Sequence, residues 1–385
     1  MRIMIVDDNP MNVMVVREML KKAGYAKIET ASSAGEMFQH LGLVDPAPLP
    51  PPKIDLILLD MMMPGIDGIE ACRRVQQSEQ WRDIPVIMVT AVGDSNKLAE
   101  ALDAGASDFV TKPINRVELL ARIRAALRLK AEMDWHKERD RRLREELELA
   151  RQVQAAALPS PVEEPRLSIR GLYRPADDLA GDLYAWYRID RDRYGIAVID
   201  AMGHGISSSL VCMFVASALR DAILTRVDPE FVIRELNRRT MQLQFSNPLI
   251  QYYFTCLYVV VDTSRGTAEY VNAGHPPGLL SRGDGSAPER LERCCTAIGL
   301  FEQIEVEKRV LDLNAGDRLF LYTDGVLELI ESGEEQRVDR LLDALLESGA
   351  DCAALENRFF LKPEPDARQD DRCLVVVEVR KGDSS

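Results

Sequence analysis

The feature that most constrains this chain is a stretch from Val117 to Leu158 that contains neither glycine nor proline. Because these two residues are the strongest breakers of regular structure, the stretch predicts one long helix. Between Lys130 and Arg151, 14 of the 22 residues are Asp, Glu, Lys or Arg, so this part offers few side chains to a hydrophobic core. We therefore predict two domains, at residues 1–125 and 159–385, joined by a helical linker at residues 126–158.

Length and composition agree with this division and narrow the function. A chain of 385 residues is too long for one ordinary domain. The net charge of -14 argues against nucleic acid or an anionic membrane as the main partner, because both would repel the chain. The 7 cysteines lack the spacing of a zinc site, and their odd number does not suggest a disulfide framework. With no signal peptide and no apolar stretch of membrane-spanning length, we expect a soluble cytoplasmic protein.

The linker has apolar residues at near-heptad spacing at both of its ends. They are Leu120, Ile123 and Leu127 at the first end, and Leu143, Leu147 and Ala150 at the second. This spacing is typical of a parallel dimeric coiled coil, which predicts a homodimer. A single solvated spacer helix is the alternative, and acid-first pairs such as Glu138 and Arg142 would support either form.

In the first third of the chain, short apolar runs at 2–6, 54–59 and 85–90 alternate with helix-like segments. This alternation predicts βαβ units around a parallel sheet, in which functional residues gather at the carboxyl ends of the strands. Those ends carry five polar residues, Asp7, Asp8, Asp60, Thr90 and Lys112. Acids after strands can also be simple helix caps, but the whole set predicts one pocket.

The pocket's chemistry would suit phosphoryl transfer. Three carboxylates are typical ligands of Mg²⁺, whose charge would let an anionic phosphoryl donor approach Asp60. Asp60 would attack phosphorus and form an acyl phosphate. Lys112 would neutralise one phosphoryl oxygen and the Thr90 hydroxyl would bond another.

The motifs IVDDN, LILLDMMMPGIDG, VTA and DFVTKP resemble the receiver domain of bacterial response regulators over about residues 1–125. The resemblance implies a doubly wound parallel five-stranded sheet, phosphorylation by a sensor histidine kinase, and Phe109 as the aromatic switch. It also implies a Mg²⁺ site formed by Asp7, Asp8, Asp60 and the Met62 carbonyl. The proline-rich insert at 44–52 departs from the pattern and predicts a stiff solvent loop.

The remaining part carries many short β-like runs with helical stretches between them, which predicts mostly antiparallel sheets flanked by helices. Acids recur at the edges of these runs, at Asp182, Asp200, Asp324 and Asp370. Several acidic ligands with few imidazoles favour Mg²⁺ or Mn²⁺ over zinc. Two such ions could hold a hydroxide and a phosphate ester for in-line attack.

The motifs AGDLY, DAMGHG, NAGHPP, LYTDGVLE and DD before a strand resemble PPM-type protein phosphatases over about residues 150–380. The lead-in LELARQVQAAALP resembles the RsbU and SpoIIE-like serine phosphatases of bacterial partner switching. The resemblance implies an α+β domain, an antiparallel β-sandwich flanked by helices. It implies two Mn²⁺ or Mg²⁺ ions held by Asp182, Asp200, the Ala201 carbonyl, Asp324 and Asp370, with Asp371 less suited than Asp370.

Together the motifs predict a response regulator that dephosphorylates phosphoserine or phosphothreonine on a protein. The family implies a STAS-domain anti-sigma-factor antagonist as the substrate. A non-catalytic module that sequesters a partner is the alternative, although a pure scaffold has no physical need for four aspartates. We expect His204 and His275 to order turns rather than bind metal, and direct proton transfer by His204 stays open.

Overall fold

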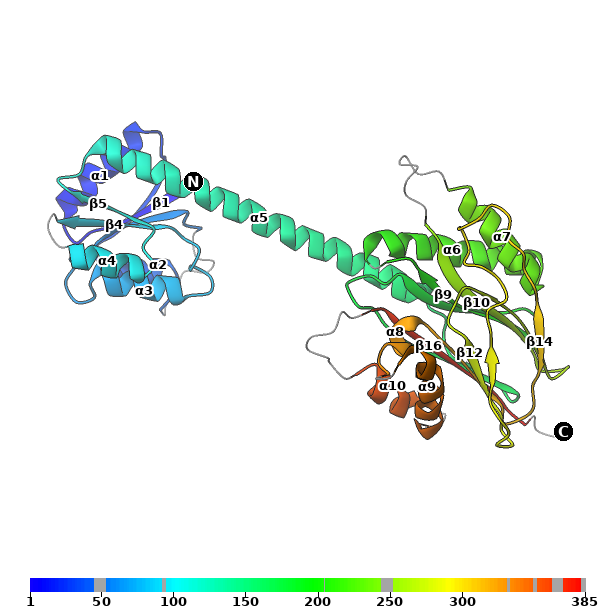
Figure 1. Ribbon diagram of the computed structural model, residues 1–385. Coiled ribbons are helices and arrows are strands. Elements are labelled where there is room, and N and C mark those ends of the chain that lie inside the picture. The colour runs from blue at the N-terminus through cyan, green and yellow to red at the C-terminus, as the bar shows by residue number, and fades with distance from the viewer. Residues whose placement is uncertain are drawn as a thin grey trace. The chain divides into compact units, whose positions relative to one another are not determined.

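The computed structural model of the chain describes residues 1–44, 53–91, 95–203, 205–243, 252–330, 333–348, 352–361 and 370–381. The chain forms two compact units, Met1–Leu143 and Arg144–Ser385. Helix α5 (Arg116–Ala157) begins in the first unit and ends in the second, as the long helix predicted from the sequence (Figure 1). The proline-rich insert after Val44 and the side chain of His204 lie outside the described residues.

The first unit is built on a parallel five-stranded sheet with the strand order β2-β1-β3-β4-β5. Its strands are β1 (Arg2–Val6), β2 (Lys27–Ala31), β3 (Leu56–Asp60), β4 (Val86–Ala91) and β5 (Asp108–Lys112). Its helices before α5 are α1 (Pro10–Lys22), α2 (Ala34–His40), α3 (Gly68–Gln77) and α4 (Ser95–Asp103). Helices cover both faces of the sheet, which confirms the doubly wound fold (Figure 1).

Local sequence accounts for these elements. All five residues of β3 are buried, as expected for a parallel strand covered on both faces. The side chains of Asn9, Ser33 and Asp67 accept hydrogen bonds from the first turns of α1, α2 and α3. The strand order reverses between β1 and β3, so the carboxyl ends of these strands form the crevice in which such sheets bind ligands.

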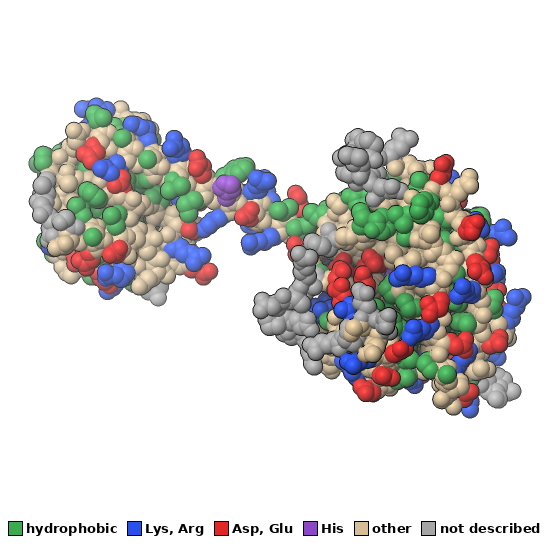
Figure 2. Space-filling view, viewed as in Figure 1, with side chains coloured by type: hydrophobic (Ala, Val, Ile, Leu, Met, Phe, Trp, Pro, Cys, Tyr) green, Lys and Arg blue, Asp and Glu red, His purple; other side chains and the backbone are tan. Residues whose placement is uncertain are grey.

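Helix α5 corrects one expectation from the sequence. Leu120, Ile123 and Leu127 are buried in the hydrophobic core of the first unit, together with residues of β1 and α1. They are therefore not available for the coiled-coil seam that their spacing suggested. Oppositely charged side chains alternate along the middle of α5 (Figure 2), and Glu138 pairs there with Arg142 at 2.8 Å.

The second unit contains two antiparallel sheets, ordered β14-β11-β10-β9-β8 and β13-β12-β15-β16-β7-β6. The strands of the first are β8 (Asp182–Arg188), β9 (Arg193–Ala201), β10 (Phe254–Asp262), β11 (Thr267–Ala273) and β14 (Arg309–Asp312). Those of the second are β6 (Val162–Glu163), β7 (Leu167–Arg174), β12 (Gly278–Ser281), β13 (Glu289–Leu291), β15 (Arg318–Tyr322) and β16 (Arg372–Val379).

These sheets form a sandwich with helices on both outer faces, as predicted. One core lies between the sheets, and α6 (Ile206–Thr225) and α7 (Pro229–Met241) pack on the five-stranded sheet. The other sheet is covered by α8 (Asp324–Leu327), α9 (Glu334–Ser348) and α10 (Cys352–Phe359). The interior of the sandwich thus fixes the strand ends that carry the predicted acids.

Helix α6 departs from the expectation that no apolar stretch reaches membrane-spanning length. Among the described helices it alone is long and apolar enough to cross a membrane, by length and composition. Yet 56% of its apolar window is buried inside the unit. Its buried side chains, such as Val215 and Leu219, pack in the core against the five-stranded sheet. The core helix of a folded domain meets the same criterion.

Candidate active sites

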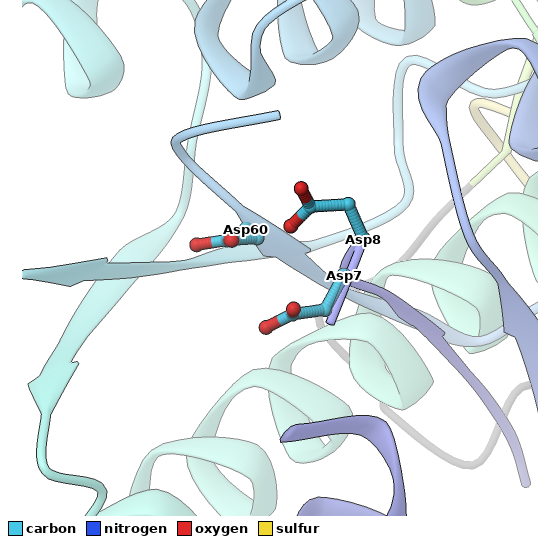
Figure 3. A group of neighbouring side chains, drawn as sticks. All are labelled: Asp7, Asp8 and Asp60. Carbon is cyan, nitrogen blue, oxygen red and sulfur yellow. The ribbon is translucent and has the colours of Figure 1, made fainter. Parts of the chain in front are cut away.

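The first site lies at the carboxyl ends of β1 and β3. Asp7 directly follows β1, and Asp60 is the last residue of β3, the neighbouring strand. Together with Asp8 they form a group whose ligand oxygens all lie within 4.8 Å of one another (Figure 3). In the part of the chain that the structure describes, no other three Asp, Glu, His or Cys side chains lie so close together. The donor set is the kind that Mg²⁺ prefers.

Lys112, the last residue of β5, contacts two of these carboxylates. Its Nζ lies 3.1 Å from Asp7 Oδ2 and 3.0 Å from Asp60 Oδ1. Burial raises the pKa of Asp60, and the negative charge of Asp7 adds to this although Lys112 opposes it. Asn12, which was not predicted from the sequence, donates through Nδ2 to both oxygens of Asp7 at 3.1 and 3.0 Å. Its position in the first turn of the helix after DD was the available signal.

The other predicted receiver residues lie on the neighbouring strands or shortly after Asp60, and the Met62 backbone amide donates a hydrogen bond to the Asp60 carboxylate. Thr90, at the end of β4, is buried and donates its hydroxyl to the Ala91 carbonyl at 3.1 Å. The half-buried Phe109 ring has the Arg122 guanidinium 5.6 Å from its centroid. Met62 is 60% exposed directly beside the site.

Gly68 also belongs to this site, although it was not predicted. A Cβ atom at this position would lie only 2.2 Å from the Asp60 carbonyl oxygen. No side chain fits that distance, so the helix start can approach the end of β3 only with glycine here. The glycine-containing motif MPGIDG was the signal in the sequence.

The second site lies at strand ends from both sheets of the second unit. Asp182 opens β8 and Asp200 lies opposite it on β9, as register partners. Asp324 opens α8 shortly after β15, and Asp370 lies just before β16. Acidic side chains gather on this face near the C-terminal end of α5 (Figure 2). The structure thus brings acids that are far apart in the sequence to one region.

These carboxylates destabilise one another's charged forms. Burial, and then the charge of Asp200, raises the pKa of Asp182 well above its usual range. Burial, followed by the charges of Asp324 and Asp370, raises the pKa of Asp200 to about 8. Burial and Asp370 raise the pKa of Asp324 to about 6. Carboxylates that repel one another in a buried site are stabilised by a cation between them.

One oxygen of Asp182 is positioned to bind a cation. Asp182 is only 3% exposed, and its Oδ2 atom is buried without a hydrogen-bond partner. Buried polar atoms without partners are rare in native proteins, and a site that binds an ion is one of their ordinary explanations. The residues present therefore fit the divalent metal site that the sequence predicted.

Asp370 and Asp371 have different environments. Both oxygens of Asp371 accept backbone hydrogen bonds, from Ala176 at 2.7 Å and from Gly181 at 2.6 Å. Asp371 is therefore occupied in holding the backbone beside Asp182. Asp370 uses Oδ1 to accept from the Asp371 amide at 2.8 Å. This geometry supports the preference for Asp370 as a ligand.

His275 connects the two sheets behind the carboxylates. Its Nε2 lies 3.0 Å from the Tyr322 carbonyl, which can only accept, so Nε2 carries the proton. Nδ1 then accepts from the Thr255 hydroxyl at 2.6 Å. Burial lowers the pKa of His275 to about 3, which keeps the ring neutral. Thr255 is the register partner of Asp200, so this buried link ends beside the site. Thr255 was not predicted, because no motif marks it.

Both units match known protein families. Residues 3–124 match the response regulator receiver domain, and residues 190–380 match the family of stage II sporulation protein E (SpoIIE). Phosphoserine phosphatase RsbP of Bacillus subtilis is 33% identical over 244 residues, which are 61% of this chain and 58% of that protein. The phosphate regulon regulatory protein PhoB of Pseudomonas aeruginosa is 40% identical over 126 residues, 33% of this chain and 51% of that protein.

Among solved structures, the SiaA-PP2C domain of Pseudomonas aeruginosa has a TM-score of 0.51 at 22% identity. The match covers 63% of this chain and 98% of that domain, and at this identity it shows the fold. The fold and sites define a receiver domain followed by a PP2C-like domain. The chain carries an N-terminal response-regulator receiver domain and a C-terminal PPM-type phosphatase domain of the SpoIIE family, as the motifs predicted.

Proposed function

We propose that this protein is a response regulator whose output is metal-dependent dephosphorylation of phosphoserine or phosphothreonine on a protein. The observation that carries the proposal is the buried, unpartnered Oδ2 of Asp182 in a group of mutually repelling aspartates. A domain that only sequestered a partner would have no need of this costly arrangement. The chain spans 58% and 51% of the curated relatives named above, so the activity of the whole protein is a proposal.

In this proposal, the chain's residues hold and orient the site. Asp182, Asp200, Asp324, Asp370 and the Ala201 carbonyl would hold two Mn²⁺ or Mg²⁺ ions. When bound, such ions supply a hydroxide nucleophile at neutral pH and neutralise charge on a phosphate ester. Asp371 fixes the backbone before Asp182 through the Gly181 amide, and His275 fixes the spacing between the two sheets.

The receiver would supply the input. Asp60 would accept a phosphoryl group from a sensor histidine kinase, with Mg²⁺ held by Asp7, Asp8, Asp60 and the Met62 carbonyl. Lys112, already 3.0 Å from Asp60, would neutralise one phosphoryl oxygen. Thr90 and Phe109 would then move inward and change the exposed face of the receiver, favouring one dimer. In this proposal the receiver spans residues 1–125, the linker 126–158 and the phosphatase domain 159–385.

The proposed substrate is a phosphorylated STAS-domain anti-sigma-factor antagonist in a cytoplasmic partner-switching pathway. Support comes from the lead-in at 147–159, which resembles partner-switching phosphatases, and from a relative that is named a phosphoserine phosphatase. We also propose a homodimer, paired through the exposed part of α5, and no nucleic-acid or membrane partner.

The test is to incubate the purified protein with the phosphorylated antagonist in Mn²⁺ or in EDTA and to follow phosphate release. We expect release only with metal, and a loss of roughly 10²-fold or more in Asp200→Asn, since a metal ligand loses its charge. Binding of the phosphoprotein without phosphate release would instead support the sequestering module. Near-normal turnover in Asp200→Asn would contradict the metal assignment.

A further inference from the structure

Gln154 is an unusual residue of the last part of α5. Its side chain is 3% exposed, whereas its neighbours Val153 and Ala155 are exposed to solvent. The Gln154 carboxamide donates from Nε2 to the Ala180 carbonyl at 2.7 Å. Through Oε1 it accepts from the Ala180 amide at 3.1 Å. One side chain of the helix thus binds both backbone groups of a single residue 26 positions away.

Ala180 lies two residues before Asp182, the buried aspartate of the phosphatase site. β8 is the edge strand of its sheet, and β9 is its paired neighbour among the described strands. The carboxamide of Gln154 therefore takes the place that a further strand would have beside the entry to β8. A glutamine can do so because its amide group has the same donor and acceptor as the peptide backbone.

Ala180 and Gly181, the two residues that lead into Asp182, are held from three directions. Asp371 accepts from the Gly181 amide at 2.6 Å, and the Ala201 amide donates to the Gly181 carbonyl at 3.1 Å. These two contacts come from residues at the ends of the sheet strands β16 and β9. The third contact is Gln154, on a helix turn whose other residues are mostly solvent-exposed. It is the contact that can change without disturbing either sheet.

Space at the segment is too tight for it to shift freely. A Cβ atom on Gly181 would lie 2.7 Å from the Gly203 carbonyl oxygen and 3.1 Å from that of Ala201. Ala180 itself is fully buried. A displacement of the backbone at Ala180 would therefore move Asp182 relative to Asp200 rather than be absorbed locally.

We propose that Gln154 is a positioning residue, and that α5 controls the affinity of the phosphatase site for divalent cations through this side chain. The proposal rests on the proposed function and adds its route of regulation. Because α5 starts in the core of the receiver unit, where Leu119 and Ile123 are buried, a change in that core reaches Ala180 along one continuous helix. Coupling of this kind requires an element with two arrangements. Here the two arrangements are Ala180 with its hydrogen bonds to Gln154 and Ala180 without them.

The test uses hydrogen–deuterium exchange in the full-length protein, read on peptides that cover residues 176–184 during a Mn²⁺ titration. This readout is local, so it reports directly on the segment that carries Asp182. Gln154→Leu keeps the size and removes both hydrogen bonds. We expect faster exchange of these peptides and about tenfold or more Mn²⁺ for half-maximal protection, the size of effect typical when a residue that supports a metal ligand is lost.

Gln152→Leu is the matched control, because Gln152 is exposed on the same helix and its carboxamide donates to Glu148. It should titrate like the native protein. Gln154→Glu keeps an acceptor for the Ala180 amide but loses the donor to the carbonyl, and should lie between native and Gln154→Leu. It also keeps the test decisive if Gln154→Leu does not fold. Unchanged Mn²⁺ dependence in the folded Gln154 variants would overturn the proposal.

The regulatory part is tested by adding beryllofluoride, which mimics the phosphorylated receiver. We expect it to change the protection of residues 176–184 in the native protein and in Gln152→Leu, but not in Gln154→Leu. No change in the native protein, or the same change in Gln154→Leu, would show that α5 does not act through this contact. If Mn²⁺ protects the segment in a Gln154-dependent way but no phosphoprotein is hydrolysed, the proposed function fails while the positioning role stands. If hydrolysis occurs and Gln154 changes neither readout, only the positioning role fails.

Discussion

At the scale of single residues, Asp60 has the surroundings of a phosphoacceptor. It is buried at a strand end, beside the carboxylates of Asp7 and Asp8 and 3.0 Å from the Lys112 ammonium. We expect acetyl phosphate and Mg²⁺ to add one phosphoryl group to the protein, and Asp60→Ala to abolish it. Intact-mass spectrometry measures the adduct, and its persistence in Asp60→Ala would place the acceptor elsewhere.

His275 makes a second prediction at this scale. His275→Leu leaves the Tyr322 carbonyl and the Thr255 hydroxyl buried without their partner, so we expect a loss of about 1–3 kcal/mol in the free energy of unfolding. Thr255→Val keeps the shape, removes one of the two hydrogen bonds, and should cost less. Chemical denaturation of both variants measures the difference, and equal costs would mean that the link through Nε2 contributes nothing.

The same residue predicts a pH dependence. The pKa of His275 is lowered from 6.5 to about 3 by burial, so below pH 6.5 the unfolded chain binds a proton that the folded chain does not. Its contribution therefore reduces stability as the pH falls from about 6.5 towards 3. The native protein should lose more stability than His275→Leu between pH 6.5 and 5, a window chosen above the titration of ordinary carboxyl groups.

At the scale of elements, the strand ends that carry Asp182 and Asp200 are under electrostatic strain when no cation is bound. The pKa of Asp200 is raised to about 8, so the folded state holds protons that the unfolded state has already released. The contribution of Asp200 to the free energy of unfolding is therefore greatest below pH 3.8, the usual pKa of this group. It is lost as the pH rises through about 8.

This repulsion predicts that metal removal reverses the order of stability between the native protein and Asp200→Asn. In EDTA at pH 8, Asp200→Asn should be more stable than the native protein by at least about 1 kcal/mol, because it removes one of the repelling charges. In Mn²⁺ the order should reverse, since the native site gains more binding energy. Calorimetry measures the stability difference in EDTA and in Mn²⁺, from the unfolding transition that the substitution shifts. If Asp200→Asn is less stable than the native protein in EDTA as well, the carboxylates do not repel one another as proposed.

Helix α5 is used differently along its length. Its first turns supply Leu119 and Ile123 to the receiver core, its middle is charged, and its end supplies Gln154 to the phosphatase unit. In the second heptad-like group, Leu143 is 49% exposed and can pair with another chain, whereas Leu147 and Ala150 are half-buried. The coiled coil thus stays a prediction for that part of α5.

At the scale of the whole molecule, two units share one helix, and we expect phosphorylation to alter the output through this helix or through a dimer that it favours. If phosphorylation activates, a fragment that begins at Pro159 should be slow and indifferent to beryllofluoride, since it lacks both the linker and Gln154. If the unphosphorylated receiver inhibits, the fragment should be faster than the full-length protein. Activity assays and light scattering separate these cases, and activation without any change from monomer would contradict the dimer mechanism.

The sequence by itself determined the two folds and the long helix, and it indicated acids that the structure places at neighbouring strand ends. It could do so because these signals are local: an apolar run ending in an acid encodes a strand and the residue at its end. The ends of neighbouring strands meet whatever the details of packing, which is why Asp7 and Asp60, or Asp182 and Asp200, come together as predicted.

Only the tertiary structure decided which side chains are used for packing and which hold the sites. Leu120 and Leu127 have coiled-coil spacing but are buried in the receiver core, because heptad spacing does not say what a helix face packs against. The same holds for Gln154, which reads as one more polar residue of a charged helix. Its partner Ala180 is 26 positions away, and a contact over that distance depends on how the helix end packs against an edge strand, which no local pattern encodes.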